Sequence, residues 1–445
     1  MYRSIGVQMA VIQKILFVVL MLGLLSLTFY SLTYLENVYL EVNNTFIRFG
    51  VTLIFTFTLL VITRYLLLIF FSMLNLIKRT AALEHTEGRE EKISIIVPCY
   101  NEESVIIPSL SSLLKQTYKY VEIIVIDDGS KDRTYELARG FEFDNGFHSL
   151  RVINIPNGGK SRALNHGIRE AHGSLICCVD ADSRLNNNAL SLLVRHFEDK
   201  QIAAVAGSVS VVNRDSFLTR LQALEYIEGL NMARNGQAFL KLVNIIPGPL
   251  GMFRKSAMAE VGYYDHDTFA EDCDLTLKLI DHNYKIDFEP DAISYTEVPE
   301  NLLDLLKQRY RWTRGILQSI HKHRESLWHL RQKPGMSFVM WYMLFESVLW
   351  PFIQLWGDLF MIYLAIEFGA SDLMLFWWLM FTVLDIAGAL YCLLVTKEDL
   401  SLAKYAIVYR LFFISVINIS KVFATIEEWF GIEMSWGKLE RKGRI

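Results

Sequence analysis

One apolar run in the first half of the chain ends in two carboxylates: Val121-Glu122-Ile123-Ile124-Val125-Ile126-Asp127-Asp128-Gly129. Its length and its β-branched residues are typical of a strand that is buried on both faces of a parallel sheet. We expect further strands at Ile93–Pro98, Arg151–Ile155 and Ser174–Val179, with helical patterns between them. This alternation predicts an α/β domain with a mixed, mostly parallel sheet and helices on both faces. In such sheets, ligands bind at the carboxyl ends of the strands.

Long apolar segments flank this domain. Hydrophobic residues make up 52% of the chain, and a run of ~20 residues is long enough to cross a hydrocarbon core. A cleaved signal peptide is the alternative for the first run, although that run is long and a second one follows. The last run is the weakest candidate, because it contains Lys404, Arg410 and Lys421. We expect a helical transmembrane bundle of four or five spans, drawn from Ile15–Leu35, Phe49–Ile77, Ser337–Ala365, Leu373–Thr396 and Leu402–Ala424.

The distribution of basic residues predicts the orientation in the membrane. Arg3 and Lys14 precede the first run, and Lys78 and Arg79 follow the second. Cytoplasmic loops are enriched in Lys and Arg, so the polar domain is expected in the cytosol, beneath an inner or plasma membrane. The basic tail at 438–444 leaves the side of the C-terminus open.

Three acidic residues, Glu346, Asp358 and Asp385, fall inside the apolar runs. Ionisable residues at that depth usually face a protein interior or a water-filled path. They therefore form either the wall of a polar channel or structural pairs within the bundle.

Charge and cysteine content exclude some classes of protein. The net charge of −4 gives no argument for nucleic acid as a partner. The cysteines show neither CxxC pairing nor zinc-ligand spacing. We expect them to be small buried side chains in a reduced compartment; they are Cys99, Cys177, Cys178, Cys273 and Cys392.

Asp180-Ala181-Asp182 follows the last of the expected strands. In an extended segment alternate residues share one side, so both carboxylates can face one site. One or two carboxylates together with substrate phosphates commonly hold Mg²⁺. A solvated turn is the alternative, which the buried-looking strand and the other acidic clusters disfavour.

Two further segments are candidates for binding a nucleotide. Asp127 and Asp128 end their strand, where a carboxylate can accept hydrogen bonds from a base or ribose; an Asp-Gly turn is the alternative. The segment Asn157–Arg162 supplies two glycines and two cations. It either contacts a diphosphate or forms an ordinary loop that enters a helix.

Glu271 and Asp272 precede an apolar helical pattern. Acidic residues in a first turn stabilise the helix dipole, and that interpretation is favoured for the pair in isolation. A functional role would make Asp272 a general base, which typically contributes ~10²–10⁴-fold when a hydroxyl must lose its proton.

Gln308, Arg311 and Trp312 are spaced i, i+3 and i+4, so on a helix they share one face. Arginine can grip a diphosphate through two hydrogen bonds, and tryptophan offers a flat apolar surface to a sugar ring. The stretch Leu302–Ile320 also fits an amphipathic helix on a membrane surface, and the two descriptions can apply to different faces.

With these residues, the chain resembles the family 2 membrane glycosyltransferases that build β-linked polysaccharides. Cellulose, chitin and hyaluronan synthases belong to this family, and the bacterial poly-β-1,6-N-acetylglucosamine synthases are the most similar branch. The resemblance rests on the order of the acidic clusters and on the segments Ile96–Glu103, Ala259–Tyr263 and Glu271–Asp274. One departure is Ala270, where many relatives have Thr.

The resemblance implies a GT-A-type nucleotide-sugar domain with Mg²⁺ or Mn²⁺ as cofactor. Asp272, beside Glu271, would deprotonate the acceptor hydroxyl, and Asp182 would bind the metal. Lys160 would face the diphosphate. The residues implied in substrate binding are Pro98, Tyr100, Glu102, Asp127, Asp128, Lys160, Asp180, Gln308, Arg311 and Trp312.

The implied organisation has four parts. Residues 1–79 hold two spans, 80–300 the cytosolic GT-A domain, 301–336 amphipathic interface helices with the Gln-x-x-Arg-Trp motif, and 337–445 a C-terminal transmembrane region with the basic tail. The implied partners are a UDP-sugar, a growing polysaccharide and the lipid bilayer. A small membrane subunit is left open.

The function expected from this resemblance is processive, inverting polymerisation of a UDP-sugar and extrusion of the β-linked product. UDP-N-acetylglucosamine is the favoured donor. One alternative is a hyaluronan- or glucan-type synthase with another donor. A second is transfer of one sugar to a membrane lipid. A third, from a different class, is a catalytically silent scaffold or channel subunit.

Overall fold

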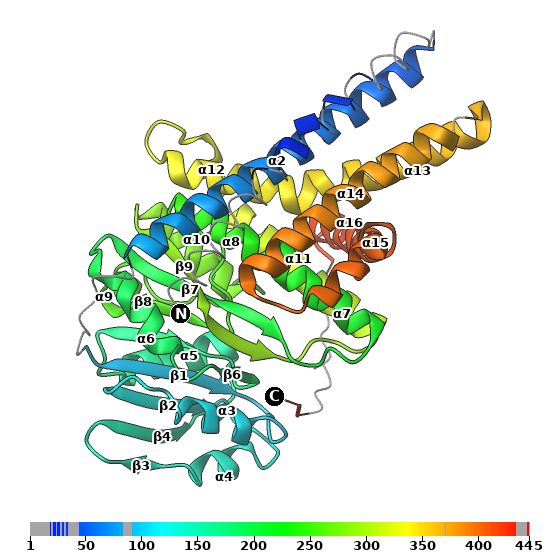
Figure 1. The fold of residues 1–445 in the computed structure, drawn as a ribbon. Coiled ribbons are helices and arrows are strands. Elements are labelled where there is room, and N and C mark those ends of the chain that lie inside the picture. The colour runs from blue at the N-terminus through cyan, green and yellow to red at the C-terminus, as the bar shows by residue number, and fades with distance from the viewer. Residues whose placement is uncertain are drawn as a thin grey trace, which may run out of the picture.

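The computed structural model describes residues 44–82, 91–369, 371–432 and 443–444, and isolated positions between 18 and 33. Most of the predicted first span, Ile15–Leu35, and most of the basic tail therefore lie outside the described residues. Figure 1 shows a sheet domain in the lower half of the molecule and long helices above it.

The sheet contains nine strands in the order β3-β4-β2-β1-β5-β8-β7-β9-β6. Four neighbouring pairs are parallel and four are antiparallel, and the three longest pairings are parallel. The expected mixed, mostly parallel sheet is thus confirmed. The strands are β1 (Ile93–Cys99), β2 (Val121–Asp127), β3 (Phe143–Asp144), β4 (His148–Asn154), β5 (Leu175–Cys178), β6 (Ser183–Leu185), β7 (Ile202–Val211), β8 (Gly251–Arg254) and β9 (Lys285–Thr296).

The apolar run at 121–127 is strand β2, which pairs in parallel with β1 on one side and with β4 on the other. Ile124 and Ile126 pack into one apolar core, whereas Ile123 and Val125 pack into the core on the opposite face. Both faces of the strand are buried, which explains its near-continuous apolar composition. All five cysteines of the chain are likewise buried.

Three of the expected strands, β1, β2 and β5, end within one residue of their predicted bounds. The exception is β4, which begins at His148 rather than at Arg151. Its parallel pairing with β2 starts at the contact between Val121 and His148. Tertiary hydrogen bonding therefore extends this strand to His148 and Ser149, which have no apolar signal of their own.

Helices cover both faces of the sheet and continue into the bundle. A π-helical segment, Glu225–Asn231, joins α7 to α8. The helices are α2 (Thr45–Ala82), α3 (Ile106–Leu113), α4 (Thr134–Arg139), α5 (Lys160–Glu170), α6 (Ala189–Val194), α7 (Phe217–Leu224), α8 (Met232–Phe239), α9 (Lys255–Glu260), α10 (Glu271–Asp281), α11 (Leu302–Lys322), α12 (Pro334–Leu344), α13 (Trp350–Phe368), α14 (Ser371–Thr396), α15 (Ala406–Val408) and α16 (Ser415–Trp429).

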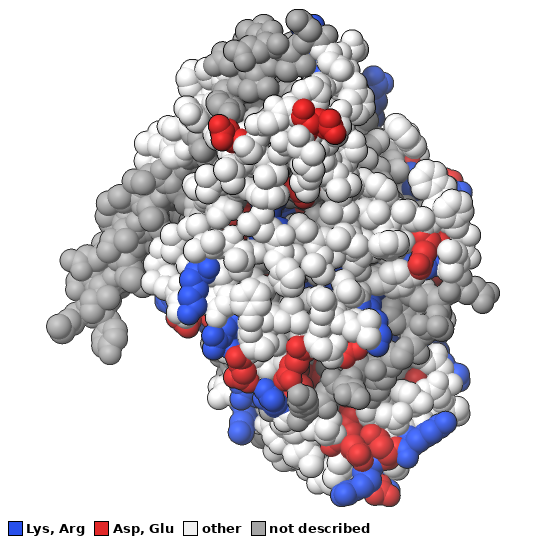
Figure 2. Space-filling view, turned by 90° about the vertical axis from the view of Figure 1, so that its right-hand side faces the viewer, with Lys and Arg blue, Asp and Glu red and all other residues white. Residues whose placement is uncertain are grey.

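Within the described residues, four helical segments are long and apolar enough to cross a membrane, judged by length and composition. Each coincides with an expected run, including the weakest one at Leu402–Ala424. Figure 2 shows a mostly uncharged surface on the upper part of the molecule and a gathering of charged side chains on the lower part. The candidate spans are Thr45–Arg79, Pro334–Phe368, Ser371–Thr396 and Leu400–Trp429.

The three acidic residues that the sequence places inside the apolar runs have polar partners. Arg410 donates hydrogen bonds to both carboxylate oxygens of Asp385, at 2.5 and 2.8 Å. Glu346 forms an ion pair with Arg64, and Asp358 accepts hydrogen bonds within its own helix. These contacts favour structural pairs within the bundle over the wall of a polar channel.

Helix α2 connects the bundle to the sheet. It is one continuous helix of 38 residues, longer than a hydrocarbon core requires at ~1.5 Å per residue. Near its C-terminal end, Arg79 lies 2.6 Å from Glu289 and 2.8 Å from Asp291 on β9. His196 joins the same cluster, with Nδ1 2.7 Å from Asp287 and Nε2 2.9 Å from Glu289.

This cluster predicts a pH-dependent stability. Burial alone lowers the pKa of His196, but hydrogen bonds with Asp287 and Glu289 outweigh burial and raise the pKa to about 9. Because the folded pKa exceeds the unfolded value of about 6.5, this stabilisation is complete below about pH 6.5 and is lost as the pH rises through about 9. We expect the melting temperature of the detergent-solubilised protein to fall by several degrees over that range.

The His196→Gln variant lacks the titrating group, so its melting temperature should fall less over the same range. His282→Gln is the matched control, because His282 is exposed and its loss should leave the wild-type pH dependence intact. Equal pH dependence in the wild type and in His196→Gln would contradict this account.

Candidate active site

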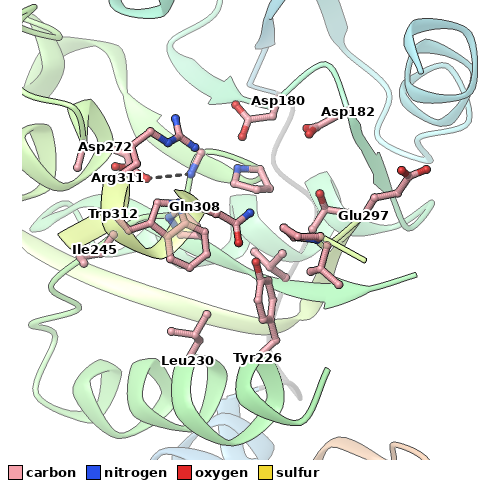
Figure 3. Close-up of a pocket in the computed structure, with 18 of the residues that line it drawn as sticks. Asp180, Asp182, Tyr226, Leu230, Ile245, Asp272, Glu297, Gln308, Arg311 and Trp312 are labelled. Atoms are coloured by element: carbon pink, nitrogen blue, oxygen red, sulfur yellow. Dashed lines mark hydrogen bonds between the residues drawn. The ribbon is translucent and has the colours of Figure 1, made fainter. Parts of the chain in front are cut away.

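A cavity of about 560 Å³ lies where the carboxyl end of β5 meets α10 and α11. Figure 3 shows Asp180 and Asp182 on one side of this cavity and Leu230 and Tyr226 on the opposite side. Eight of the sequence-predicted site residues line it: Lys160, Asp180, Asp182, Glu271, Asp272, Gln308, Arg311 and Trp312.

Asp180 and Asp182 reach the cavity from the segment between β5 and β6. The backbone N–H of Ser183 donates to the carbonyl oxygen of Asp180 at 3.1 Å, which closes a turn. The expectation of an extended segment is therefore wrong, although both side chains still line the cavity. Two carboxylates on one wall offer the oxygen ligands that Mg²⁺ and Mn²⁺ prefer.

Lys160 joins two acidic clusters that are far apart in the sequence. It begins α5, and its Nζ lies 2.7 Å from Asp180 Oδ1 and 2.9 Å from Glu271 Oε1. Burial lowers the pKa of Lys160, but the two carboxylates outweigh burial and raise it, so the ammonium stays charged. Gly159 precedes the helix with φ of 90°, a conformation that L side chains rarely adopt.

Asp272 and Glu271 form the first turn of α10. The N–H of Cys273 donates to Asp272 Oδ1 at 2.8 Å, and the N–H of Gly248 donates to Oδ2 at 3.3 Å. Burial first, and the charge of Glu271 second, raise the pKa of Asp272 to about 6. This carboxylate can therefore accept a proton near neutral pH. Ala270 stands at the N-cap without a side-chain cap hydrogen bond, so the acids alone complement the helix dipole.

Helix α11 presents Gln308, Arg311 and Trp312 to the cavity from one face, as their spacing predicts. Arg309 is 3% exposed and pairs with Glu225 at 2.5 Å. Its guanidinium also lies 4.1 Å from the centroid of the Trp312 ring. The ion pair and the cation–π contact together hold the indole in its orientation.

The opposite side of α11 packs against the last candidate span. Arg314 forms an ion pair with Glu428 of α16 and donates to the carbonyl oxygen of Ile432 at 2.8 Å. Tyr310 donates to Glu427. Helix α11 therefore touches the cavity on one side and the bundle on the other, rather than only lying on a membrane surface.

Five of the predicted residues lie outside the lining of the cavity: Pro98, Tyr100, Glu102, Asp127 and Asp128. Pro98 borders a small adjoining pocket. The carboxylates of Asp127 and Asp128 instead accept hydrogen bonds from nearby loops. Asp128 accepts a hydrogen bond from the N–H of Gly158 at 2.9 Å and another from the N–H of Gly159 at 2.8 Å. Asp127 accepts the amide of Asn154 at 2.8 Å. Their proposed contacts with a nucleotide stay predictions.

Sequence reasoning missed a second wall of the cavity. Tyr226, Leu230 and Arg234 line it from the π-helical segment and α8, and Glu297 lines it beyond β9. No local motif marks these residues, because 217–239 has the composition of an ordinary packed helix. The spacing of four between the first three is the only signal that could have grouped them.

A separate acidic group lies away from the predicted metal ligand, Asp182. Asp265, Asp267 and Asp274 are close enough to one another to hold a cation. Lys322 Nζ lies 2.7, 2.8 and 2.9 Å from their carboxylates. An ammonium therefore already occupies the position between these carboxylates, which makes the group a structural cluster.

Residues 94–262 match the family described as Glycosyl transferase family 2. The match includes the turn with Asp180 and Asp182, and it ends before Asp272 and before α11. This part of the chain matches a family 2 glycosyltransferase domain, which confirms the resemblance drawn from the sequence.

Two relatives carry the same name, poly-beta-1,6-N-acetyl-D-glucosamine synthase. The one from Staphylococcus aureus (strain COL) is 35% identical over 266 residues, which is 60% of this chain and 64% of the relative. The one from Staphylococcus epidermidis (strain ATCC 35984) is 31% identical over 280 residues, which is 62% of this chain and 66% of the relative. The matched part thus spans slightly less than two thirds of these relatives.

A solved structure shares the fold. It is the mannosyltransferase PcManGT from Pyrobaculum calidifontis in complex with GDP-Man and Mn²⁺, with a TM-score of 0.53 and 17% sequence identity. The superposition covers 83% of this chain and 99% of the other. The domain therefore has the expected GT-A-type fold.

The hydrogen bonds of Asp128 predict a structural cost for its removal. Asp128→Ala would leave the N–H groups of Gly158 and Gly159 without their acceptor, and we expect a loss of roughly 2 kcal/mol, seen as a lower melting temperature. Asp144→Ala is the control, because it removes one exposed hydrogen bond to Gly146 and should change stability by less than about 0.5 kcal/mol. Equal melting temperatures for the two variants would show that Asp128 does not hold this loop.

Proposed function

We propose that the chain is a membrane-bound, inverting glycosyltransferase that polymerises UDP-N-acetylglucosamine into a β-linked polysaccharide and extrudes it across the membrane. One observation carries the proposal: a single cavity unites a carboxylate of raised pKa, an acidic turn with its lysine, and the Gln-x-x-Arg-Trp face of α11. The family 2 domain supports the reaction class, and the names of the relatives support the choice of sugar.

The donor would bind along the wall formed by Lys160 and Asp180. Lys160 now contacts two carboxylates, and it would exchange one of them for an oxygen of the donor diphosphate. Arg311, on α11, would hold the same diphosphate through paired hydrogen bonds. Asp128, with Tyr100 and Glu102, would contact the uridine.

A divalent cation fits beside this wall. Asp182, with Asp180 next to it, offers carboxylate oxygens on the cavity side, and oxygen ligands suit Mg²⁺ or Mn²⁺. When bound, such an ion would supply positive charge next to the leaving diphosphate.

Asp272 is the proposed general base. Its carboxylate would take the proton from the acceptor hydroxyl as that oxygen forms a bond to C1 of the donor sugar. The bond from C1 to the diphosphate breaks, and UDP leaves with the electron pair. Attack from the side opposite the leaving group turns an α-linked donor into a β-linkage. Glu271, held by Lys160, supplies the neighbouring charge that raises the pKa of Asp272.

The acceptor would lie on the Trp312 side and leave between the candidate spans. Helix α11 supports this path, because it lines the cavity and also packs against α16. The excess of Lys and Arg around the first two apolar runs supports a multi-pass protein with its catalytic domain in the cytosol. The experiment below uses this chain alone, so UDP release and polymer formation there would show that no small membrane subunit is required.

The first experiment is to purify the full chain in lipid nanodiscs with Mg²⁺ or Mn²⁺, measure UDP release over a panel of UDP-sugars, and size the product. We expect a long polymer, sensitive to β-N-acetylglucosaminidase, with UDP-N-acetylglucosamine. If the product is a glycolipid with a single sugar, the function is transfer of one sugar to a lipid and not polymerisation. Activity with another donor alone would place the chain with the hyaluronan- or glucan-type synthases, and no UDP release from any donor would overturn the proposal.

The assignment of Asp272 as the base predicts the effect of its substitution and the pH dependence of the activity. Asp272→Asn should lower polymer formation by ~10²–10⁴-fold while UDP still binds, because only the base is lost. In the wild type, activity should fall as the pH drops through about 6, where Asp272 becomes protonated. Asp267→Asn is the control, since it removes an exposed carboxylate that pairs with Lys322 and does not line the cavity. Polymer formation by Asp272→Asn at the wild-type rate would exclude Asp272 as the base.

A further inference from the structure

One buried cation in the cavity has no partner. Arg234 lies on α8, is 8% exposed and lines the cavity. Within the described part of the chain it makes no hydrogen bond or ion pair, and its Nη1 is buried without an acceptor. By contrast, the similarly buried Arg309, Arg314 and Arg410 each pair with a carboxylate. Arg234 is therefore the exception among these buried arginines.

A buried charge without a partner destabilises the folded state. Its presence in the cavity therefore needs a functional explanation. Burial lowers the pKa of Arg234 to about 10, with Asp272 acting in the opposite direction. The guanidinium is thus still charged at neutral pH. A cation that opposes folding and faces a cavity is expected to serve a ligand.

Arg234 lies on the side of the cavity that we assign to the acceptor. It follows Leu230 by one helical turn, and both line the cavity. Leu230 and Trp312 pack against the same apolar cluster. Figure 3 shows Leu230 across the cavity from Asp180 and Asp182, where the donor diphosphate would bind.

The surroundings of Arg234 define the chemistry of its ligand. Leu230, Ile245 and Trp312 make this part of the wall apolar, which suits the uncharged face of a sugar ring. The carboxylate of Asp272 on the same cavity disfavours an anionic sugar. A protonated amine would meet the charge of Arg234 in a poorly solvated site, where like charges repel strongly. The sugar that best suits this part of the cavity is uncharged and carries a strong oxygen acceptor, such as the carbonyl oxygen of an acyl amide.

We propose that Arg234 determines acceptor specificity: its guanidinium donates hydrogen bonds to the acyl oxygen of an N-acetylated terminal sugar, and its charge excludes a terminal sugar with a free amine. This inference rests on the proposed polymerase function and deepens it. Elongation would then require that the last sugar of the growing chain keep its acyl group.

The test measures acceptor binding to the full chain in lipid nanodiscs by calorimetry, without donor. The probes are a β-1,6-linked tetrasaccharide of N-acetylglucosamine and the same tetrasaccharide with glucosamine at its non-reducing end. The variants are Arg234→Gln and Arg234→Met, with Arg169→Gln as the control at an exposed arginine of α5. UDP affinity and melting temperature are measured for every protein.

We expect wild type and Arg169→Gln to prefer the fully acetylated probe. Both Arg234 variants should bind it about 10- to 100-fold more weakly, the usual effect of losing hydrogen bonds from a charged donor, and should no longer discriminate against the amine. Their UDP affinity should stay at the wild-type value. Arg234→Met should melt at the wild-type temperature or above it, because it removes an unpaired buried charge.

Three results would overturn the inference. One is equal binding of the two probes by the wild type. Another is unchanged affinity for the acetylated probe in Arg234→Gln. The third is a fall in the melting temperature of Arg234→Met together with weaker UDP binding, which would mark a structural role. Failure of the polymerase function is seen separately, as absence of UDP release by the wild type, because probe binding needs no donor.

Discussion

Parallel hydrogen bonding at the centre of the sheet is the constraint on which the site depends. β1 pairs with β2 and with β5 in the same direction, so the residues that follow these strands meet at one edge. Asp128 and Asp180 reach that edge from different strands. Lys160 then draws the start of α10 to it by bridging Asp180 and Glu271. The proposed base is therefore positioned by this edge as well as by the first turn of α10, where the N–H of Cys273 holds its carboxylate.

Helix α11 connects the cavity to the candidate spans. One side carries Gln308, Arg311 and Trp312 into the cavity, and the other is bound to α16 through Arg314 and Glu428. Arg309 also contacts the indole of Trp312, so the proposed platform for a sugar lies on the same helix that packs against the last candidate span. The proposed site of reaction and the proposed path of the product through the bundle would therefore share one helix.

Local patterns in the sequence predicted β1, β2, β4 and β5, the acidic clusters at the ends of β2 and β5, and the shared face of α11, because each depends on neighbours within a few residues. The other five strands of the sheet were not predicted. Contacts between distant segments were beyond such patterns. Through such contacts Asp128 accepts hydrogen bonds from backbone N–H groups. The segment Asp180–Asp182 forms a turn, and Arg234 lies at the cavity. Arg234 has no local signature, since a cation on a packed helix is usually read as a solvated or paired residue.

The burial of all five cysteines has a practical consequence for mapping this protein. The native surface offers no accessible thiol, so a single cysteine introduced into a loop would be the only site that reacts with a membrane-impermeant maleimide. Labelling intact cells and then opened vesicles would report on which side each loop lies, without first replacing native residues. The orientation of every candidate span is therefore open to direct chemical measurement on an otherwise unaltered chain.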